Sequence, residues 1–437
     1  MGLFPTGFYN NSEKVCQEAW KQDQDMNIIA VIILVTLISD YTLNLVADFL
    51  NVRSIKHTLP EAFQGLYDAE RYTRSQEYLR VTTWFGLVSN TFHLIVLVAF
   101  WFFKGFPLLD TWARSFSFGS VTTGLIYIGV LAGARAIIAL PFSIYATFVI
   151  EERFGFNNMT WKTFVADMVK GGVLSSILGA FLLSVVISFF EYADKNGWFY
   201  CWIAMTILIL ALQYIVPTWI MPLFNKFKPL EEGELKTALM EYARAIHFPL
   251  TNVFVMDGSK RSSKSNAFFT GFGNNKRIVL FDTLIENHSV DELVSVMAHE
   301  MGHYKLKHIL KMIVLSVCHT GVLLYLFSLF ISYEPLFNAF FMPHVSVYAG
   351  LIFFGMLYSP VDFFIGVLLQ RFSRKNEYDA DRFAVITHRN PHVFIHALKK
   401  LTVDNLSNLT PHPLYVWLHY SHPPILNRVD AIEKMTI

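Results

Sequence analysis

Charged residues and cysteines are scarce in this chain of 437 residues. Only 16% of its residues are Asp, Glu, Lys or Arg, whereas a soluble domain usually carries about 25%. The formal net charge is +1, so no excess of basic residues points to nucleic acid. The three cysteines, Cys16, Cys201 and Cys318, form no C-x-x-C pair and are expected to be unpaired. These shortages argue against a soluble protein and against nucleic-acid binding.

Apolar residues are correspondingly abundant. Hydrophobic residues make up 54% of the chain, which includes 41 Phe and 9 Trp, and the mean hydropathy is +0.40. A helix needs about 20 apolar residues to cross a bilayer. Stretches of this length cover residues 26–47, 82–103, 119–149, 171–190, 198–222, 309–332 and 347–370. The sequence therefore predicts a mostly helical, polytopic membrane protein with about seven spans.

Lysine and arginine are unevenly distributed between the two sets of connections. The richer set comprises residues 48–81, 150–170, 223–308 and 371–437. Because cytosolic connections are enriched in Lys and Arg, this set is expected to face the cytosol and the N-terminus to face the lumen. The glycosylation sequon Asn10-Asn11-Ser12 then lies on the lumenal side.

The most informative stretch, SVDELVSVMAHEMGHYKLKHIL, begins at Ser289. Ser289 followed by Glu292 is typical of a capping box, which predicts that a helix begins there. Within that helix, His299, Glu300 and His303 form the pattern H-E-x-x-H. Residues four apart lie on one helix face, so both imidazoles can bind one zinc ion, and Glu300 can accept a proton from water. Unpartnered histidines would be costly among the apolar neighbours, which favours a metal site over core packing. The helix is expected to run straight into the sixth apolar stretch.

A third ligand is expected because a zinc hydrolase has three protein ligands and leaves one position for water. Glu377 and Asp381 follow the seventh apolar stretch, as the two histidines precede the sixth. An antiparallel pair of spans would bring these ends together. Glu377 is expected to bind zinc, and Asp381 to accept the Nδ1 proton of a zinc histidine. The alternative is a solvated, charged helix end, of which Arg374 would be an ordinary part.

A rigid turn is predicted near the C-terminus, where His422 precedes two prolines, because residues before proline avoid the helical region. His422 can donate a hydrogen bond to the oxyanion formed when a peptide carbonyl is attacked. Arg428 can organise nearby carboxylates or receive a substrate terminus. The other histidines, including His308, are expected to be structural or exposed.

Short strands are predicted in the polar region, at residues 252–256, 266–270 and 277–281, after a helix within residues 231–248. Residues 271–276 are expected to form a hairpin turn rather than a phosphate loop. The segment around Asn266, Ala267 and Phe268 alternates loosely, as an edge strand does, and such a strand leaves backbone donors and acceptors free.

These motifs resemble the signatures of the type 1 CAAX prenyl proteases, integral-membrane zinc peptidases of the gluzincin class. The resemblance rests on His299-Glu300-x-x-His303, Glu377-x-x-x-Asp381 and Ser421-His422-Pro423-Pro424. It extends over nearly the whole chain and includes IEERFGFN at 150–157, PLF at 222–224, SNAF at 265–268 and KRIVLFDTL at 276–284.

The resemblance implies roles for individual residues. It implies one zinc ion per chain, bound by His299, His303 and Glu377, with Glu300 as general base. Asp381 matches an aspartate described either as supporting the zinc ligands or as a proton donor. His422 matches the transition-state histidine of the family. Asn266, with Ala267 and Phe268 beside it, falls on the strand that pairs with the peptide substrate, and Arg428 is a further candidate for substrate binding.

The resemblance also implies seven helices around a chamber in the membrane, with an α+β catalytic part and the zinc site at its cytosolic end. The implied reaction is removal of the C-terminal tripeptide from isoprenylated CAAX proteins. It would take place in the endoplasmic reticulum membrane and in some cases the inner nuclear membrane, with membrane lipid as a further partner.

Two other functions remain open on the sequence alone. One is a related membrane gluzincin that cuts misfolded or stalled chains. The other is a non-catalytic seven-span receptor or transporter, in which the intramembrane residues Asp40, His93, Arg135 and Asp362 would mark a substrate path. The expected organisation is a membrane region (1–222), a catalytic region (223–308), two further spans (309–370) and a C-terminal part that completes the zinc site (371–437). The oligomeric state is left open.

Overall fold

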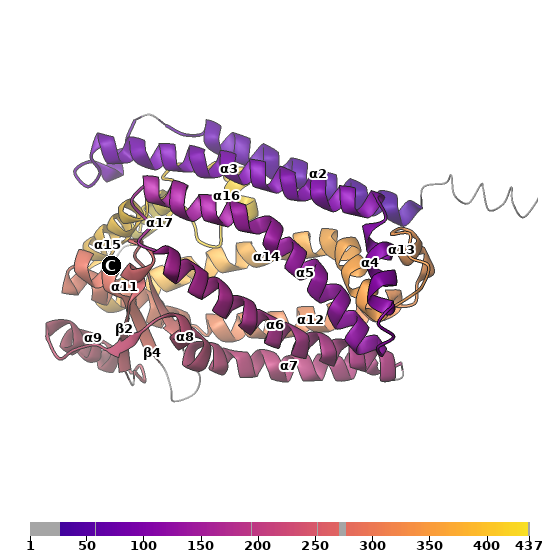
Figure 1. Ribbon diagram of the computed structural model, residues 1–437. Coiled ribbons are helices and arrows are strands. Elements are labelled where there is room, and N and C mark those ends of the chain that lie inside the picture. Colours follow the sequence, from indigo (N-terminus) through magenta and orange to yellow (C-terminus); the bar gives the residue numbers. More distant parts are fainter. Residues whose placement is uncertain (1–26, 57, 194, 251, 271–276, 436–437) are drawn as a thin grey trace, which may run out of the picture.

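Long apolar helices run side by side through most of the computed structural model (Figure 1). It describes residues 27–56, 58–193, 195–250, 252–270 and 277–435. Within these residues, seven helices are long and apolar enough to cross a membrane. They are built on α2 (Ile28–Arg53), α3 (Ala69–Phe102), α5 (Ser120–Tyr145), α6 (Trp161–Tyr192), α7 (Gly197–Ile215), α12 (His308–Phe330) and α14 (Val347–His388). The predicted helical membrane fold with about seven spans is confirmed.

Several of these helices extend beyond the predicted apolar stretches. The helix predicted at 82–103 begins at Ala69, and the one predicted at 347–370 continues to His388. α5 and α7 each continue through a π-helical segment, η2 (Ala146–Glu151) and η3 (Val216–Ile220), and η3 leads into α8 (Met221–Phe224). The predicted bounds were too short because hydropathy falls where charged residues begin, whereas backbone hydrogen bonding in a helix continues past that point.

α4 (Gly105–Arg114) and α13 (Glu334–Asn338) lie at one end of the bundle (Figure 1). Aromatic side chains form much of the core around them. The Trp101 Nε1 group donates to the Ala339 carbonyl at 2.8 Å. The rings of Phe340 and Phe353 stack with their centroids 3.9 Å apart. Stacked and edge-on aromatic pairs of this kind stabilise a core beyond their buried area. They tie α3 and α14 together at the end of the molecule away from the sheet.

A four-stranded sheet lies at the opposite end (Figure 1). Its order is β1 (Phe227–Pro229), β2 (Asn252–Met256), β4 (Arg277–Phe281) and β3 (Ala267–Thr270). β2 and β4 are parallel and the other pairs are antiparallel. The three predicted strands are confirmed, except that Asn266 lies just before β3. β1 was not predicted, because three residues that include a proline give no alternation to detect.

Helices surround this sheet and complete the chain. They are α9 (Glu234–Ala245), α10 (Asp282–Asn287), α11 (Val290–Lys305), α15 (Pro391–Asp404), α16 (Pro413–His419) and α17 (Ile425–Glu433), with short η1 (Glu61–Phe63) and η4 (Gly258–Lys260). α9 confirms the helix predicted in this region. The predicted turn at 271–276, the Asn10 sequon and Cys16 lie outside the described residues, and within them Cys201 and Cys318 are free.

The capping box at the start of α11 is present as predicted. The Ser289 Oγ accepts from the Glu292 N–H at 3.3 Å, and the Glu292 carboxylate accepts from the Ser289 N–H at 2.8 Å. The cap fixes which residues of α11 face the core: Leu293, Met297 and Met301 are buried with residues of the sheet and α9. α11 also packs along α14, which positions the histidine face of one helix against the charged end of the other.

The expectation that this helix runs straight into the sixth span is wrong. α11 ends at Lys305, and α12 begins at His308. Between them Lys307 adopts a left-handed conformation with φ 58°, and its N–H donates to the Tyr304 carbonyl at 2.9 Å. A left-handed residue costs roughly 1–2 kcal/mol when it carries a Cβ. Hydrophobic patterning gives no hint of such a turn when the residue is not glycine.

The segment before β3 is anchored to the membrane helices. Arg261 forms two hydrogen bonds with the Asp167 carboxylate of α6, at 2.8 and 3.0 Å. Lys264 forms an ion pair of 2.9 Å with Glu151 at the end of η2, and its ammonium lies 4.4 Å from the centre of the Phe156 ring. Paired charges and a cation–π contact hold a segment in one orientation. The position of β3 is therefore set by the ends of the helices.

Gly302 allows the close approach of α11 and α14. A Cβ at this position would lie 3.1 Å from Cδ1 of Phe383. We expect Gly302→Val to destabilise the protein by about 1–3 kcal/mol through overpacking, seen as a lower thermal unfolding midpoint in detergent. Gly366→Val on α14 is the control, because no atom lies within 4 Å of a Cβ there. An unchanged midpoint for Gly302→Val would contradict the close packing of these helices.

Candidate metal centre

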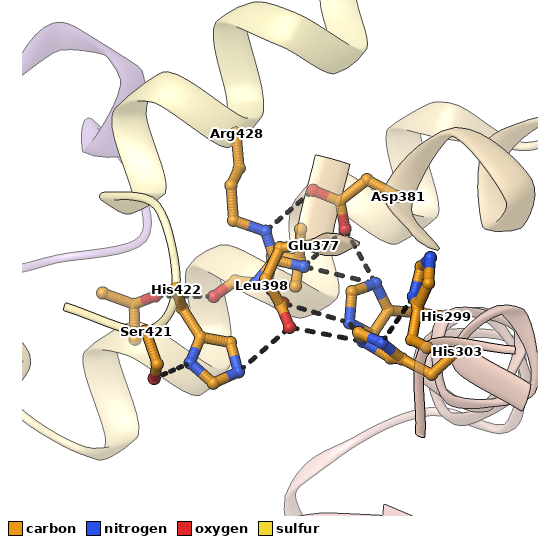
Figure 2. A network of polar contacts seen from close by, with 10 residues as sticks. His299, His303, Glu377, Asp381, Leu398, Ser421, His422 and Arg428 are labelled. Atoms are coloured by element: carbon orange, nitrogen blue, oxygen red, sulfur yellow. Dashed lines mark hydrogen bonds and ion pairs between the residues drawn. The ribbon is translucent and has the colours of Figure 1, made fainter. Parts of the chain in front are cut away.

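Three side chains from α11 and α14 converge on one point (Figure 2). The Nε2 atoms of His299 and His303 are 3.2 Å apart. Glu377 Oε2 lies 3.4 Å from His299 Nε2, and Glu377 Oε1 lies 3.3 Å from His303 Nε2. Among the described residues, these three form the group of side chains whose ligand atoms lie close enough together, within 4.8 Å of one another, to bind one metal ion.

The dimensions and chemistry of this group fit a zinc ion. Zinc bonds of about 2.0–2.1 Å at tetrahedral angles place ligand atoms about 3.3–3.4 Å apart, and two histidines with one glutamate are a known catalytic ligand set. Glu377 Oε2 is buried, and no hydrogen-bond donor within the described residues satisfies it. A buried carboxylate oxygen without a donor is costly. A cation at this point would satisfy it.

His299 is held from behind by Asp381. Its Nδ1 lies 2.8 Å from Asp381 Oδ1. Burial lowers the pKa of His299, but the hydrogen bonds with Asp381 and Glu377 outweigh burial and raise that pKa to about 9. A proton and a metal ion compete for the same imidazole, so the raised pKa reports a site that strongly favours positive charge.

Glu300 lies on the same helix and is half-buried. Burial raises the pKa of its carboxyl above the usual value, while His299 and His303 act in the opposite direction. A carboxylate with a raised pKa is a stronger base than an exposed one. Its position beside the three candidate ligands suits proton transfer.

His422 approaches the same centre from the rigid turn between α16 and α17, which is non-helical as predicted. Its Nε2 lies 3.3 Å from Glu377 Oε1, and 63% of its side chain is exposed. Figure 2 shows its ring between Ser421 and Glu377, and Ser421 Oγ lies 2.8 Å from its Nδ1. An exposed imidazole at the rim of the centre is available to an incoming ligand.

Arg374 positions this turn, a role that the sequence did not suggest. Its Nη1 donates to the carbonyls of Val416 at 3.1 Å and Tyr420 at 2.5 Å. An arginine that satisfies the carbonyls at a helix C-terminus fixes the chain that follows. Because Arg374 stands one turn before Glu377, α14 sets the place of both Glu377 and His422. Only its position before the ligand motif could have indicated this.

Arg428 is buried, and its guanidinium group binds the carboxylate of Asp381. It binds Asp381 through two hydrogen bonds of 2.8 and 2.5 Å, and its Nη1 lies 4.0 Å from Glu377 Oε2. Of the two roles expected for Arg428, this geometry matches the organisation of carboxylates, because its guanidinium fork is occupied by Asp381 rather than open to a substrate terminus.

β3 is an edge strand within the described sheet, next to β4 only. The Phe281 N–H donates to the Asn266 carbonyl at 3.1 Å, so antiparallel alternation turns the backbone groups of Ala267 away from β4 and those of Phe268 toward it. Asn266 is exposed, and its Oδ1 accepts the Ala267 N–H at 2.8 Å. Of the predicted substrate-binding residues on this strand, Ala267 is the one with an outward-facing backbone donor.

A cavity beside the metal centre is lined in part by Asn405, which holds the residue two positions before β3. Asn405 of α15's C-terminal end binds both backbone groups of Ser265, each at 3.1 Å. It also lines a cavity of about 370 Å³ together with His422 and Arg428. Asn405 therefore links the segment that leads into β3 to a cavity that His422 and Arg428 also line.

His308 is a second residue that the sequence did not single out. Its Nδ1 lies 3.1 Å from Nδ1 of His303. Its distance from the H-E-x-x-H motif along the chain gave no sign of contact, because residues five apart point to different faces of an uninterrupted helix.

Comparison with known proteins agrees with this geometry. The family described as CAAX prenyl protease N-terminal, five membrane helices, matches residues 48–226. Peptidase family M48 matches residues 229–436. The chain is 32% identical over 404 residues to CAAX prenyl protease 1 of Saccharomyces cerevisiae, which covers 86% of this chain and 89% of that protein. The chain belongs to the CAAX prenyl protease 1 family.

Further similarities extend over most of the chain. The CAAX prenyl protease 1 homolog of Homo sapiens is 34% identical over 433 residues, covering 88% of this chain and 90% of that protein. The crystal structure of S. mikatae Ste24p matches with a TM-score of 0.88 at 32% identity, over 93% of this chain and 99% of that one. As a member of this family, the chain is a multi-pass membrane metalloprotease, so the non-catalytic receptor or transporter alternative is wrong.

Arg428 should be needed for stability as well as for the site. We expect Arg428→Met to leave the buried carboxylates of Asp381 and Glu377 without their cation and to destabilise the metal-free protein by about 3–5 kcal/mol. Thermal unfolding in detergent measures the change. Arg71→Met removes an ion pair with Asp404 in which Arg71 is 44% exposed, and should cost at most about 1 kcal/mol. Similar effects of the two substitutions would contradict the buried pair.

Proposed function

We propose that this chain is a zinc endopeptidase that removes the C-terminal tripeptide from isoprenylated CAAX proteins. The convergence of His299, His303 and Glu377 beside Glu300, in a metalloprotease of this family, carries the proposal. The substrate class is supported by the names of the relatives, which are CAAX prenyl proteases. The zinc assignment is supported by the ligand set and its spacing.

The residues around the centre have distinct parts in peptide hydrolysis. When bound by His299, His303 and Glu377, zinc supplies Lewis-acid chemistry that polarises the scissile carbonyl and acidifies water. Glu300 accepts the proton of the attacking water and returns it to the leaving amine. His422 donates a hydrogen bond to the oxyanion from the exposed rim. Asp381 keeps the proton of His299 on Nδ1 and is itself held by Arg428.

The peptide adds to the free edge of β3 as a further strand. Edge pairing uses backbone groups, so one site accepts tripeptides of different sequence. Ala267 offers its backbone outward, and the Asn266 side chain lies beside it. The anchoring of the preceding segment by Arg261 and Lys264 keeps this edge fixed relative to the helices.

The lipid of the substrate occupies the membrane part of the molecule. The metal centre lies at the ends of α12 and α14 nearest the sheet (Figure 1), so a peptide at the centre and a lipid between the helices can belong to one substrate. Burial of an isoprenyl chain contributes about 0.8 kcal/mol per CH₂ before the ordering costs of binding.

The same proposal includes the orientation of the chain in the membrane and its division into membrane and catalytic regions. The metal centre faces the cytosol, and the N-terminus faces the lumen of the endoplasmic reticulum. The distribution of Lys and Arg supports this orientation. The inner nuclear membrane is a second location. Residues 1–222 and 309–370 form the membrane regions, and 223–308 together with 371–437 complete the zinc site.

A pair of peptides tests the proposed substrate class. A farnesylated peptide ending in a CAAX sequence and its unmodified twin are incubated with the purified protein, and kcat/KM is compared. The farnesylated peptide should be cleaved at least about tenfold more efficiently, because lipid burial contributes to binding. Equal cleavage of both would favour the alternative of a quality-control peptidase for misfolded or stalled chains.

Substitutions should distinguish the role of Glu377 as a zinc ligand from that of Glu300 as the general base. Glu377→Ala removes one of three protein ligands and should lose both zinc and activity. Glu300→Gln should keep zinc, measured by elemental analysis, and lose nearly all turnover, because an amide cannot accept the proton of water. Full zinc occupancy in Glu377→Ala would require another ligand, and substantial turnover in Glu300→Gln would require another base.

The free edge of β3 should be needed for cleavage. Ala267→Pro deletes an outward-facing N–H and should impair cleavage while zinc content persists. Ala267→Val keeps that N–H and serves as the control. Phe268→Pro differs, because its N–H faces β4, and it should destabilise the sheet as well. Normal cleavage by Ala267→Pro would mean that the peptide is held elsewhere.

A further inference from the structure

His308 stands directly behind one of the candidate zinc ligands. It is buried, with 3% of its surface exposed, and its Nδ1 lies 3.1 Å from Nδ1 of His303. Its Nε2 is also buried and has no hydrogen-bond partner within the described residues. His308 is not one of the three side chains whose ligand atoms converge. It contacts the rear nitrogen of His303, away from the nitrogen that faces Glu377.

The contact depends on the break between α11 and α12. In a continuous helix, residues 303 and 308 would be about 140° apart around the axis and their rings would diverge. Lys307 instead adopts φ 58°, and α12 begins only at His308. A left-handed conformation is unfavourable for lysine, so its presence beside the motif indicates that this arrangement is held by the surrounding structure.

The positions of the ring protons determine which of His303 and His308 donates the hydrogen bond between them. His303 Nε2 faces Glu377 and His299, and a nitrogen that binds a metal presents a lone pair. The ring proton of His303 then resides on Nδ1. Two imidazole nitrogens at 3.1 Å need one donor and one acceptor, so His308 Nδ1 must accept and the proton of His308 must lie on Nε2.

We propose that His308 is a positioning residue of the metal centre, which accepts the Nδ1–H of His303 and so fixes the tautomer and orientation of that ligand. This inference rests on the proposed zinc site. It gives His303 the support that Asp381 gives His299 through a contact of 2.8 Å. Partners of this kind typically change metal affinity about 10–100-fold when they are removed.

Zinc affinity of the full chain, measured by competition with a chromogenic chelator in detergent, tests the proposal. His308→Leu fills the space without an acceptor and should weaken zinc binding about 10–100-fold. His308→Asn offers Oδ1 near the place of Nδ1 and should stay within about threefold of the unsubstituted protein. His319→Leu, the same change on the same helix, is the control; His319 contacts Tyr358 instead. Thermal unfolding of the metal-free variants identifies any change that acts through folding alone.

The outcomes separate this proposal from the proposed function. No zinc binding by the unsubstituted protein would overturn the function itself. Zinc binding that is equal in His308→Leu and the unsubstituted protein, or lost equally in His308→Leu and His308→Asn, would overturn the role of His308 alone. If His308→Leu does not fold, Lys307 provides the test. Lys307→Gly accepts a positive φ and should retain zinc affinity, whereas the β-branched Lys307→Val should weaken it. Equal affinity in these two variants would overturn the proposal.

Discussion

The packing of α11 against α14 depends on neutralising buried carboxylates. Glu377 and Asp381 are both buried on the face of α14 that meets α11. Arg428 supplies one positive charge and is bound to Asp381 by two hydrogen bonds. Glu377 is left facing two imidazole nitrogens, with one oxygen that no donor among the described residues satisfies. Buried charge without a partner is strongly unfavourable, so the fold itself calls for a cation where the histidines and Glu377 meet.

Two parts of the chain that are far apart in sequence must be correctly placed for the histidines and Glu377 to meet. The histidines follow a sheet that is anchored to the helix ends through Arg261 and Lys264. Glu377 and Asp381 stand on the extension of a membrane-spanning helix. Arg374 on the same extension holds the turn that carries His422. Helix α14 therefore sets the relative positions of the candidate ligand Glu377, of Asp381 and of His422.

The sequence alone predicted the seven membrane helices, the helices that became α9 and α11, three of the four strands and the convergence of His299, His303 and Glu377. These predictions succeeded because they rest on local periodicity and on side chains that are seldom buried together unless they bind a metal ion. The missed features depend on contacts between distant segments or on single backbone angles. The αL turn at Lys307, the contact of His308 with His303 and the carbonyls bound by Arg374 leave no periodic signal. The outward direction of Ala267, as opposed to Phe268, depends on a strand register that only pairing fixes.

The two candidate histidine ligands are supported by different parts of the fold. His299 is held by Asp381 on α14, which is held in turn by Arg428 on α17. His303 contacts His308 at the start of α12. A metal ion at this centre would therefore be sensitive to the relative placement of α11, α12, α14 and α17, and binding energy would be shared among them. By linkage, a ligand that binds only the assembled arrangement stabilises it. Metal binding and the docking of the C-terminal segment onto the membrane helices should thus be coupled, because the same few hydrogen bonds serve both.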